Sequence, residues 1–312
     1  MKKRVLAGVL AAGLLAVCLG GCGAAGRQSA EESTESRETE ASEEEKVKDT
    51  AILVVSFGTS YNDSREATIG AIEKDIADAF PKYEVRRAFT SQIIIDKLKE
   101  RDGLEIDNVE QALDRAVADG IKNLVVQPTH LMNGYEYTDL ANALKDYEAK
   151  FDSIALGEPL LSSDGDFDLV ILAITNKLKS YDDGKTAIAF MGHGTEADSN
   201  GVYGKLQDML TEQGYENFYI GTVEATPSLD DLIAAFKEKG SYEKVVLEPL
   251  MVVAGDHANN DMAGDEDDSW KSILTKEGYE VECILEGLGQ VPEIRSIYVN
   301  HVANALKTVT GE

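Results

Sequence analysis

The sequence predicts an α/β fold made of two similar Rossmann-like halves, each with a parallel sheet, that face each other across a cleft. From residue 50 onward, short apolar runs alternate with amphipathic stretches, which is typical of a parallel sheet covered by helices on both faces. The turn at 56–59 (SFGT) recurs at 192–195 (GHGT), 136 residues later. A second match relates 128–134 (PTHLMNG) to 249–255 (PLMVVAG), 121 residues apart. We therefore expect a duplicated unit with strand ends lining the cleft between the halves.

The individual elements follow from the period of the apolar residues. Strands are predicted over 51–57, 83–89, 123–128, 153–156, 186–191, 217–221, 244–249 and 280–285. Helices are predicted over 63–80, 91–101, 107–119, 136–150, 166–181, 199–213, 228–239, 268–277 and 291–308. The first lobe then spans 50–182 and the second 183–312, and we expect the terminal helix to pack back on the first lobe.

The first 49 residues do not follow this pattern. Residues 1–22 have the features of a secretory signal: three basic residues, then an apolar Ala/Leu-rich stretch and the ending Leu-Gly-Gly-Cys. The last of these residues, Cys22, resembles a lipobox cysteine. The following residues, 23–49, are rich in Ser and Glu without an apolar period, so they predict a disordered acidic tether. The expectation is an exported protein, lipid-anchored to a bacterial membrane.

Composition excludes several classes of function. The formal net charge of −27 argues against nucleic acid as a partner. Beyond the signal and lipobox, Cys283 is the single thiol, which excludes an internal disulfide and a cysteine metal cluster. The glycines after strand 186–191 lack the acidic residue of a dinucleotide fingerprint and the lysine of a phosphate loop.

Three potential metal ligands follow three predicted strands of the second half: His193, Glu224 and His257. The carboxyl ends of parallel strands are where open α/β sheets bind ligands, and two histidines with a carboxylate suit Co²⁺, Ni²⁺, Fe²⁺ or Zn²⁺. Each residue also has a structural interpretation. His193 can cap a helix after a tight turn, Glu224 can stabilise a helix N-terminus, and His257 can be an ordinary turn residue. The coincidence of all three favours a metal site.

Three further residues are candidates for a substrate cleft. His130 follows strand 123–128 of the opposing half, where it either faces the cleft or packs under its loop. Arg86 and Arg87 end strand 83–89, and the strand period sends one of them inward. An inward arginine suits recognition of a carboxylate, whereas a surface salt bridge is the alternative interpretation.

The longest motifs together resemble those of a known family. They are VVSFGTSY, YEVRRAFTS, VVQPTHLMNGYEY, FMGHGTE, GTVEATPSLDDL and LMVVAGDHANNDMAGDEDDSW, distributed from about residue 50 to residue 308. The chain resembles the anaerobic-type (class II) sirohydrochlorin cobalt chelatases, which have a chelatase fold of two Rossmann-like halves. The resemblance implies insertion of Co²⁺ into the tetrapyrrole sirohydrochlorin, as in cobalamin biosynthesis. It implies metal ligation by His193, Glu224 and His257. Under the enzymatic hypothesis His193 and Glu224 are also the catalytic residues, because they accept the protons that the tetrapyrrole releases.

Two features depart from that family. Biosynthetic members are usually cytoplasmic, whereas this chain carries the signal, lipobox and tether. The stretch 197–203 (ADSNGVY) also differs from the family's usual histidine-containing form. The alternative hypothesis is a membrane-anchored receptor that binds haem, another tetrapyrrole or a metal without turnover and hands it to a transporter.

Overall fold

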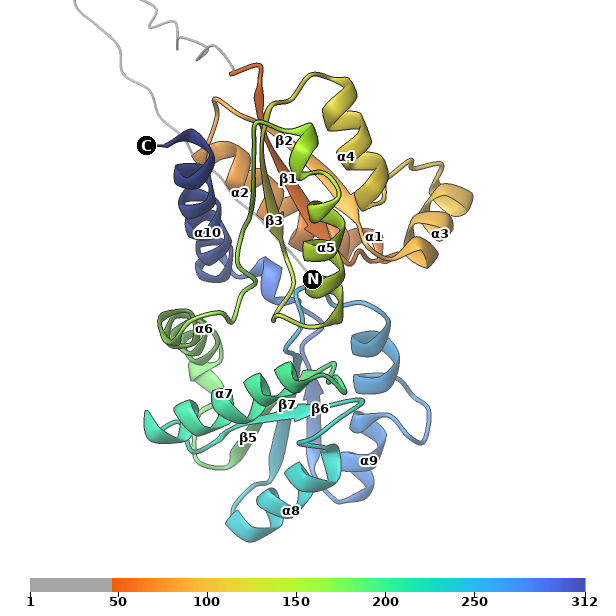
Figure 1. Cartoon of the computed structure of the whole chain (residues 1–312). Helices are drawn as coiled ribbons and strands as arrows, with labels where there is room; N and C mark the ends of the chain where they lie inside the picture. Colours follow the sequence, from red (N-terminus) through yellow and green to blue (C-terminus); the bar gives the residue numbers. More distant parts are fainter. Residues whose placement is uncertain (1–46, 312) are drawn as a thin grey trace, which may run out of the picture. The chain divides into compact units, whose positions relative to one another are not determined.

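Two four-stranded parallel sheets form the framework of residues 47–311, the part of the chain that the computed structural model describes (Figure 1). The first sheet has the order β2-β1-β3-β4, with β1 Thr50–Ser56, β2 Glu84–Phe89, β3 Asn123–Pro128 and β4 Ser153–Leu156. The second has the order β6-β5-β7-β8, with β5 Thr186–Gly192, β6 Phe218–Thr222, β7 Lys244–Pro249 and β8 Glu280–Cys283. The two orders are equivalent, so the predicted α/β fold with two similar parallel-sheet halves is confirmed.

Helices follow the strands in both lobes. They are α1 Asn62–Arg65, α2 Ala71–Ala79, α3 Gln92–Asp102, α4 Val109–Ala118, α5 Tyr135–Lys145, α6 Asp164–Lys177, α7 Gly201–Glu212, α8 Leu229–Lys239, α9 Trp270–Lys276 and α10 Pro292–Thr310. Short 3₁₀ turns lie at 148–150, 179–181, 198–200 and 288–290, and π turns at 66–70 and 258–262. Capping boxes at Asn108, Ser163 and Ser228 fix the starts of α4, α6 and α8, because each side chain accepts from a backbone N–H of the first turn.

The predicted boundaries agree with these elements to within a few residues, with one larger difference. The helix predicted over 63–80 is divided into α1, the π turn at 66–70 and α2. Thr68 lies within this turn, and its hydroxyl donates to the carbonyl of Ser64 at 2.5 Å. Such back-bonding by a threonine competes with the regular helical ladder.

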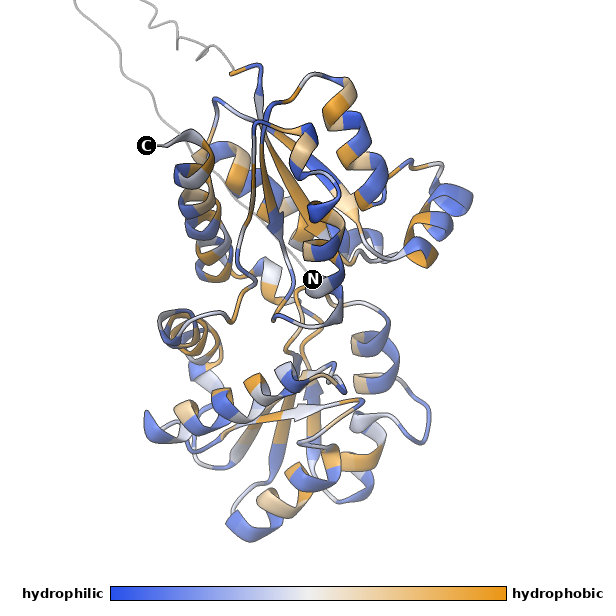
Figure 2. Cartoon of the chain, viewed as in Figure 1, coloured by the Kyte–Doolittle hydropathy of each residue, from blue (hydrophilic) through white to orange (hydrophobic). Residues whose placement is uncertain are grey.

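Each sheet is apolar on both faces, and the strand period assigns the two faces to different cores. In β1, Ala51, Leu53 and Val55 pack on α4 and α5, whereas Ile52 and Val54 point to the opposite face. In β5, Ala187, Ala189 and Met191 pack on α8 and α9, whereas Ile188 and Phe190 join Ile52 and Val54 in one cluster. That cluster also contains apolar residues of α2, α6, α7 and α10. Figure 2 shows the resulting apolar strands and the helices with one apolar side. The two lobes therefore share one continuous core.

The last helix packs on the first lobe. Arg295 of α10 donates to Asp75 of α2 at 2.5 Å, and the hydroxyl of Tyr298 donates to the carbonyl of Thr129, just after β3, at 2.9 Å. His301, 8% exposed, places its ring nitrogens 3.0 Å from the carbonyl of Glu158 and 3.2 Å from the carboxylate of Asp166. The chain thus leaves the first lobe after α6, builds the second sheet and returns.

The predicted signal peptide 1–22, its Cys22 and the tether up to residue 46 lie outside the described residues. The end of the predicted tether is part of the fold, however. The N–H of Val47 donates to the carbonyl of Lys82 at 2.8 Å, and the carbonyl of Asp49 accepts from Lys122 and Asn123. Over residues 47–311, no helix has both the length and the apolar character needed to span a bilayer.

A buried ion pair connects the end of α6 to the second sheet. Lys177 contacts Glu248 of β7 at 2.5 Å and Glu286 at 2.8 Å. The side chain of Glu248 is 1% exposed, and its burial raises the pKa of its carboxyl group although the hydrogen bond to Lys177 opposes this. Burial alone would lower the pKa of Lys177, but its hydrogen bonds to Glu248 and Glu286 leave it raised. The charge of Glu248 is therefore compatible with burial because of Lys177, which Glu286 also neutralises.

We predict that Lys177→Met destabilises the fold by about 3 kcal/mol at pH 7, because it leaves Glu248 buried without a cation. The loss should shrink as the pH falls, since the pKa of Glu248 is raised in the folded protein and protonation then removes the unpaired charge. The double variant Lys177→Met/Glu248→Met should return close to the wild type. Urea unfolding at pH 7 and pH 5 measures both effects. An equal loss in the single and double variants would show that the ion pair does not matter.

Candidate metal centre

The three predicted metal ligands come together at the carboxyl end of the second sheet. His193 follows β5, Glu224 follows β6 and His257 follows β7, and these strands are neighbours in the order β6-β5-β7. One ligand atom from each side chain lies within 4.8 Å of the other two. His193 and Glu224 are exposed and His257 is half-buried, so an ion can reach all three from solvent.

Two glycines give His193 its position. Gly194 has φ +87°, and a Cβ there would lie 2.8 Å from the backbone nitrogen of Ala225. A Cβ at Gly192 would lie 2.3 Å from the ring of Tyr203, whose hydroxyl accepts from the N–H of Gly194 at 3.3 Å. Only glycine lets the turn approach both neighbours this closely. The Nδ1 of His193 contacts the carbonyl of Gly194 at 2.8 Å, and if it donates there, Nε2 is free for a metal.

Backbone pairing sets the spacing between His193 and Glu224. The N–H of Val223 donates to the carbonyl of Gly192 at 3.0 Å, and that of Glu224 to the carbonyl of His193 at 2.9 Å. The parallel ladder between β5 and β6 therefore continues through the ligand residues themselves. The carboxylate of Glu224 lies 3.6 Å from Nδ1 of His193. The distance between these two ligands thus depends on main-chain hydrogen bonds and not on loop packing alone.

His257 is oriented by a carboxylate one helical turn away. Its Nδ1 contacts Asp261 at 2.7 Å, and its ring meets that of His193 edge to face, with centroids 4.6 Å apart at 88°. A carboxylate on Nδ1 fixes the tautomer that presents Nε2, and it raises the basicity of the ring toward a metal. His257 opens the π turn at 258–262, a type of turn that is frequent at functional sites.

The donor set fits a borderline divalent ion. Two imidazoles and a carboxylate leave at least one coordination position open, which is the arrangement of a reactive site and not of a closed structural one. Donors about 2.1 Å from a tetrahedral ion lie roughly 3.4 Å apart, so movements of about 1 Å would bring these side chains onto a metal. No other group of three or more His, Cys, Asp or Glu residues within 47–311 has this proximity.

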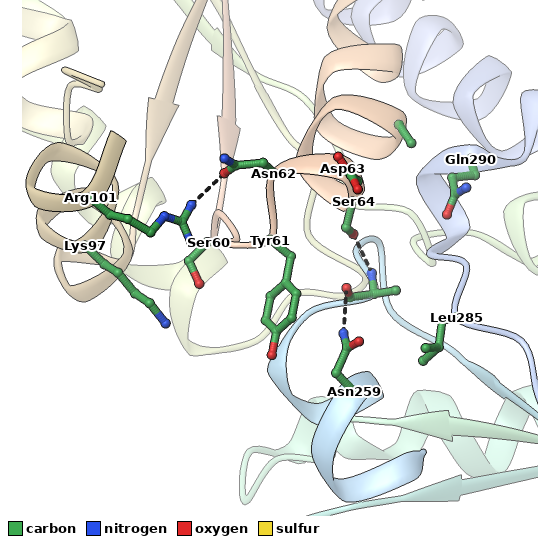
Figure 3. A pocket seen from close by; sticks show the side chains of 12 residues that line it. Ser60, Tyr61, Asn62, Asp63, Ser64, Lys97, Arg101, Asn259, Leu285 and Gln290 are labelled. Carbon is green, nitrogen blue, oxygen red and sulfur yellow. Dashed lines mark hydrogen bonds between the residues drawn. The ribbon is translucent and has the colours of Figure 1, made fainter. Parts of the chain in front are cut away.

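The carboxyl ends of the two sheets meet next to this centre. The N–H of Ala254 donates to the hydroxyl of Ser64 at 3.0 Å, and the hydroxyl of Tyr61 lies 3.4 Å from the carboxylate of Asp256. Between the lobes lies a cavity of about 550 Å³ whose walls include residues 60–64 of the first lobe and Asn259 of the second (Figure 3). The loop that carries His257 therefore forms part of the cavity wall.

Comparison with known proteins shows which family the chain is similar to. Residues 50–307 match the family model described as cobalt chelatase (CbiK). The chain is 40% identical to a sirohydrochlorin cobaltochelatase of Salmonella typhimurium over 262 residues, 84% of this chain and 98% of that protein. The chain belongs to the cobalt chelatase family. It is also 31% identical to a sirohydrochlorin cobaltochelatase, CbiKC, of Nitratidesulfovibrio vulgaris, over 83% of this chain and 91% of the relative.

Solved structures agree with the chelatase fold. SirB from Bacillus subtilis with Fe³⁺ superposes with a TM-score of 0.57 at 13% identity, covering 84% of this chain and 98% of that one. A complex of the sirohydrochlorin chelatase SirB with cobalt, from Bacillus subtilis subspecies spizizenii, gives a TM-score of 0.54 at 14% identity. It covers 84% of this chain and 97% of the other. At these identities the likeness concerns the fold alone.

His130 does not join the metal centre of this chelatase-family chain. Burial lowers the pKa of its ring to about 4, although Glu136 opposes the shift, so the imidazole is neutral at pH 7. Neither ring nitrogen has a hydrogen-bond partner among the described residues. His130, like the three metal ligands, is not in the wall of the cavity between the lobes.

The structure places Arg86 and Arg87, the two arginines considered for the substrate cleft, in ion pairs of the first lobe. Arg86 pairs with Glu84 at 2.9 Å and with Asp119 at 2.8 Å. Arg87 makes a two-pronged ion pair with Glu73 of α2. Carboxylates of the first lobe thus neutralise both guanidinium groups, and neither residue lines the cavity between the lobes. The partner of Arg87 comes from α2, whereas those of Arg86 are Glu84 of the same strand and Asp119 after α4.

Two residues of the centre were not predicted from the sequence. Asp261 supports His257 and lies four residues after it, so the helical spacing His-x-x-x-Asp was the available signal. Tyr203 supports the turn of His193 from within the stretch 197–203, which had been noted only for lacking histidines. Cys283 is half-buried, and its burial raises the pKa of the thiol, which agrees with an unreactive packing residue.

We predict that Gly194→Ala weakens Co²⁺ binding at least tenfold, because the new Cβ pushes Ala225, and with it Glu224, away from His193. Gly184→Ala is the matched control: its φ of +79° is also positive, but a Cβ there meets nothing within 4 Å. Both variants carry the strain of a left-handed alanine, so both should lose some thermal stability. Calorimetric titration with Co²⁺ should separate them. Equal affinities in the two variants would contradict the role of the close approach.

Proposed function

We propose that the protein is a sirohydrochlorin cobaltochelatase, an enzyme that inserts Co²⁺ into the tetrapyrrole. The observation that carries the proposal is the group of His193, Glu224 and His257 at the strand ends, beside a cavity between the lobes. Membership in the cobalt chelatase family supports it, as does the name of a relative that is 40% identical over most of both chains. The metal is the substrate of this reaction and not a resident cofactor.

Metal capture is the first task of the three ligands. The two imidazoles bind through neutral nitrogens and Glu224 adds one negative charge, so a bound divalent ion keeps a net positive charge toward the ring nitrogens of the tetrapyrrole. Capture must be reversible, because the ion has to leave for the macrocycle. Solvent-exposed ligands with an open coordination position favour this release more than a closed tetrahedral cage does.

Proton transfer is the second task. The ring loses two pyrrole N–H protons as the metal forms its bonds to the ring nitrogens, and bases near the metal must accept them. His193 suits this role because the ring nitrogen that releases the ion is then free to take a proton. The carboxylate of Glu224, 3.6 Å from the ring of His193, can accept the second proton. Delivery of the metal and removal of protons are thus coupled at the same side chains.

The first lobe contributes an aromatic surface in place of a metal ligand. Phe57 follows β1 at the position that His193 has after β5, and it is 49% exposed. An exposed aromatic ring at the end of a central strand suits stacking on a flat macrocycle. The duplicated fold therefore supplies metal ligands from one half and an apolar face from the other.

The donor set is also compatible with Ni²⁺, Fe²⁺ and Zn²⁺, because imidazole and carboxylate ligands do not discriminate strongly among these ions. The names of the relatives support Co²⁺ as the physiological ion. Competition among the four ions in one insertion assay would establish the order of preference.

We predict that the purified protein accelerates cobalt insertion and that His193→Ala abolishes the acceleration. Anaerobic incubation with sirohydrochlorin and Co²⁺, followed by the absorbance change on insertion, measures the rate. Glu224→Gln should slow insertion at least a hundredfold, since it removes both a ligand charge and a base. Glu266→Gln, at an exposed carboxylate outside the three ligands, is its control.

The receptor hypothesis predicts a different outcome for the same assay. A receptor would bind tetrapyrrole or metal in stoichiometric amounts, without accelerating insertion over the uncatalysed rate. That result with the wild-type protein would reject the enzyme and leave the binding protein, with transfer to a transporter as its next test.

We also propose that the protein is exported and anchored through a lipid on Cys22. The support is the sequence of 1–22, with its basic start, apolar stretch and Leu-Gly-Gly-Cys ending, followed by an acidic polar tether. This location would place the chelatase outside the cytoplasm, where metal or tetrapyrrole is received at the membrane.

We predict that Cys22→Ala prevents labelling with palmitate and releases the protein from the membrane fraction, because the lipid chains are the main source of membrane affinity. Cys18→Ala, within the same signal, should leave both properties unchanged. Recovery of wild-type protein from the cytoplasm with residues 1–21 still attached would reject the anchor.

A further inference from the structure

Two cationic side chains line the cavity between the lobes from one face of α3. Lys97 and Arg101 are four residues apart, so they lie on the same side of the helix, one turn from each other. Figure 3 shows them beside Tyr61 and Asn62, with Leu285 and Gln290 on the other side of Tyr61 in the view. The cavity of about 550 Å³ is in the range of sites that hold drug-sized ligands.

The two cations differ in how far they are already neutralised. The guanidinium of Arg101 contacts the carboxylate of Asp102 at 2.8 and 2.5 Å and the side chain of Asn62 at 2.6 Å. Lys97 is exposed and has no ion pair or side-chain hydrogen bond with any residue of 47–311. Lys99 on the same helix, by contrast, pairs with Glu105 at 3.2 Å. Lys97 is therefore available to an anion that enters the cavity.

Lys97 gives the cavity an available cation although the chain as a whole is acidic. The formal net charge is −27, so the surface as a whole repels anions, and a polyanionic substrate needs a local region of positive potential to approach. Asp63 also lines the cavity, and Figure 3 shows it on the side away from Lys97. Lys97 and Arg101 thus line the side of the cavity formed by α3, and Asp63 lies away from Lys97 (Figure 3).

The cationic end is connected to the metal centre through a short path. Tyr61 lies next to Asn62, which contacts Arg101, and the hydroxyl of Tyr61 is 3.4 Å from Asp256, the residue before His257. Asn259, two residues after His257, forms another part of the wall. The cavity that Lys97 lines therefore also borders the loop that presents a metal ligand.

We propose that Lys97, with Arg101 beside it, binds carboxylate groups at the rim of the tetrapyrrole and so selects a polycarboxylated macrocycle. This inference rests on the proposed function, because it assigns that site its substrate class. Sirohydrochlorin carries acetate and propionate side chains around its rim, and each can accept charge-assisted hydrogen bonds from an ammonium or guanidinium group. Leu285, 45% exposed on the same cavity, offers an apolar contact for the ring.

Equilibrium binding of metal-free sirohydrochlorin tests the proposal without requiring turnover. The full chain and its variants are titrated with sirohydrochlorin, and the quenching of ligand fluorescence gives the dissociation constant. Lys97→Met keeps the aliphatic stem and should weaken binding about tenfold, and Lys97→Glu should weaken it further. Lys99→Met, the matched control on α3, should bind as the wild type does. Co²⁺ affinity should be the same in all four proteins.

A second ligand tests the assigned chemistry. Mesoporphyrin, which has far fewer carboxylates, should bind equally well to wild type and Lys97→Met. Rising salt should weaken sirohydrochlorin binding more in the wild type than in Lys97→Met, because the ionic contact is screened. Equal sirohydrochlorin affinity in wild type and Lys97→Met would overturn the proposal even if cobalt insertion were observed. A Lys97-dependent affinity in a protein that does not insert cobalt would support the recognition site and reject only the proposed turnover.

Discussion

The shared apolar core between the two sheets is the constraint on which the rest of the molecule depends. Ile52 and Val54 from one central strand and Ile188 and Phe190 from the other belong to a single buried cluster, completed by α6, α7 and α10. Burying apolar surface stabilises a fold by roughly 25 cal/mol per Å². The many apolar side chains of this cluster therefore contribute more to holding the lobes together than the few polar contacts between them. The core therefore fixes how the carboxyl ends of the sheets meet, and it leaves the loops at those ends free for chemistry.

Duplication followed by divergence explains the asymmetry of the centre. The same strand order in both lobes presents equivalent turns after β1 and β5 and after β3 and β7. In the second lobe these turns carry His193 and His257, while the first lobe has Phe57 at the position of His193. Such an unequal pair of halves suits a reaction that joins a metal ion to a flat macrocycle, because one half carries the metal ligands and the other an aromatic side chain.

The fold could be predicted from the sequence because both strand and helix periods are strong here. Strands buried on both faces appear as short apolar runs, and the helices start at Ser, Asn and Pro signals that the structure uses. The proximity of His193, Glu224 and His257 followed from a rule of parallel sheets, since neighbouring strands end at one edge. What the sequence could not predict depends on contacts between distant elements. The partner of Arg87 is Glu73 on a preceding helix, and the cavity face of Lys97 appears only when the lobes are assembled.

The path of the chain has a consequence for how the protein is made. Residues 47–177 and α10 build the first lobe, so the second lobe is formally an insertion between its sixth helix and its last one. A ribosome or a translocation channel delivers the chain from its N-terminus, and α10 emerges at the very end. Until then the face of the first sheet with Ile52, Val54 and Val125 is covered by α2 and α6 but lacks the contribution of α10. The second lobe can complete its fold earlier. The first lobe, although it is synthesised first, is therefore completed last.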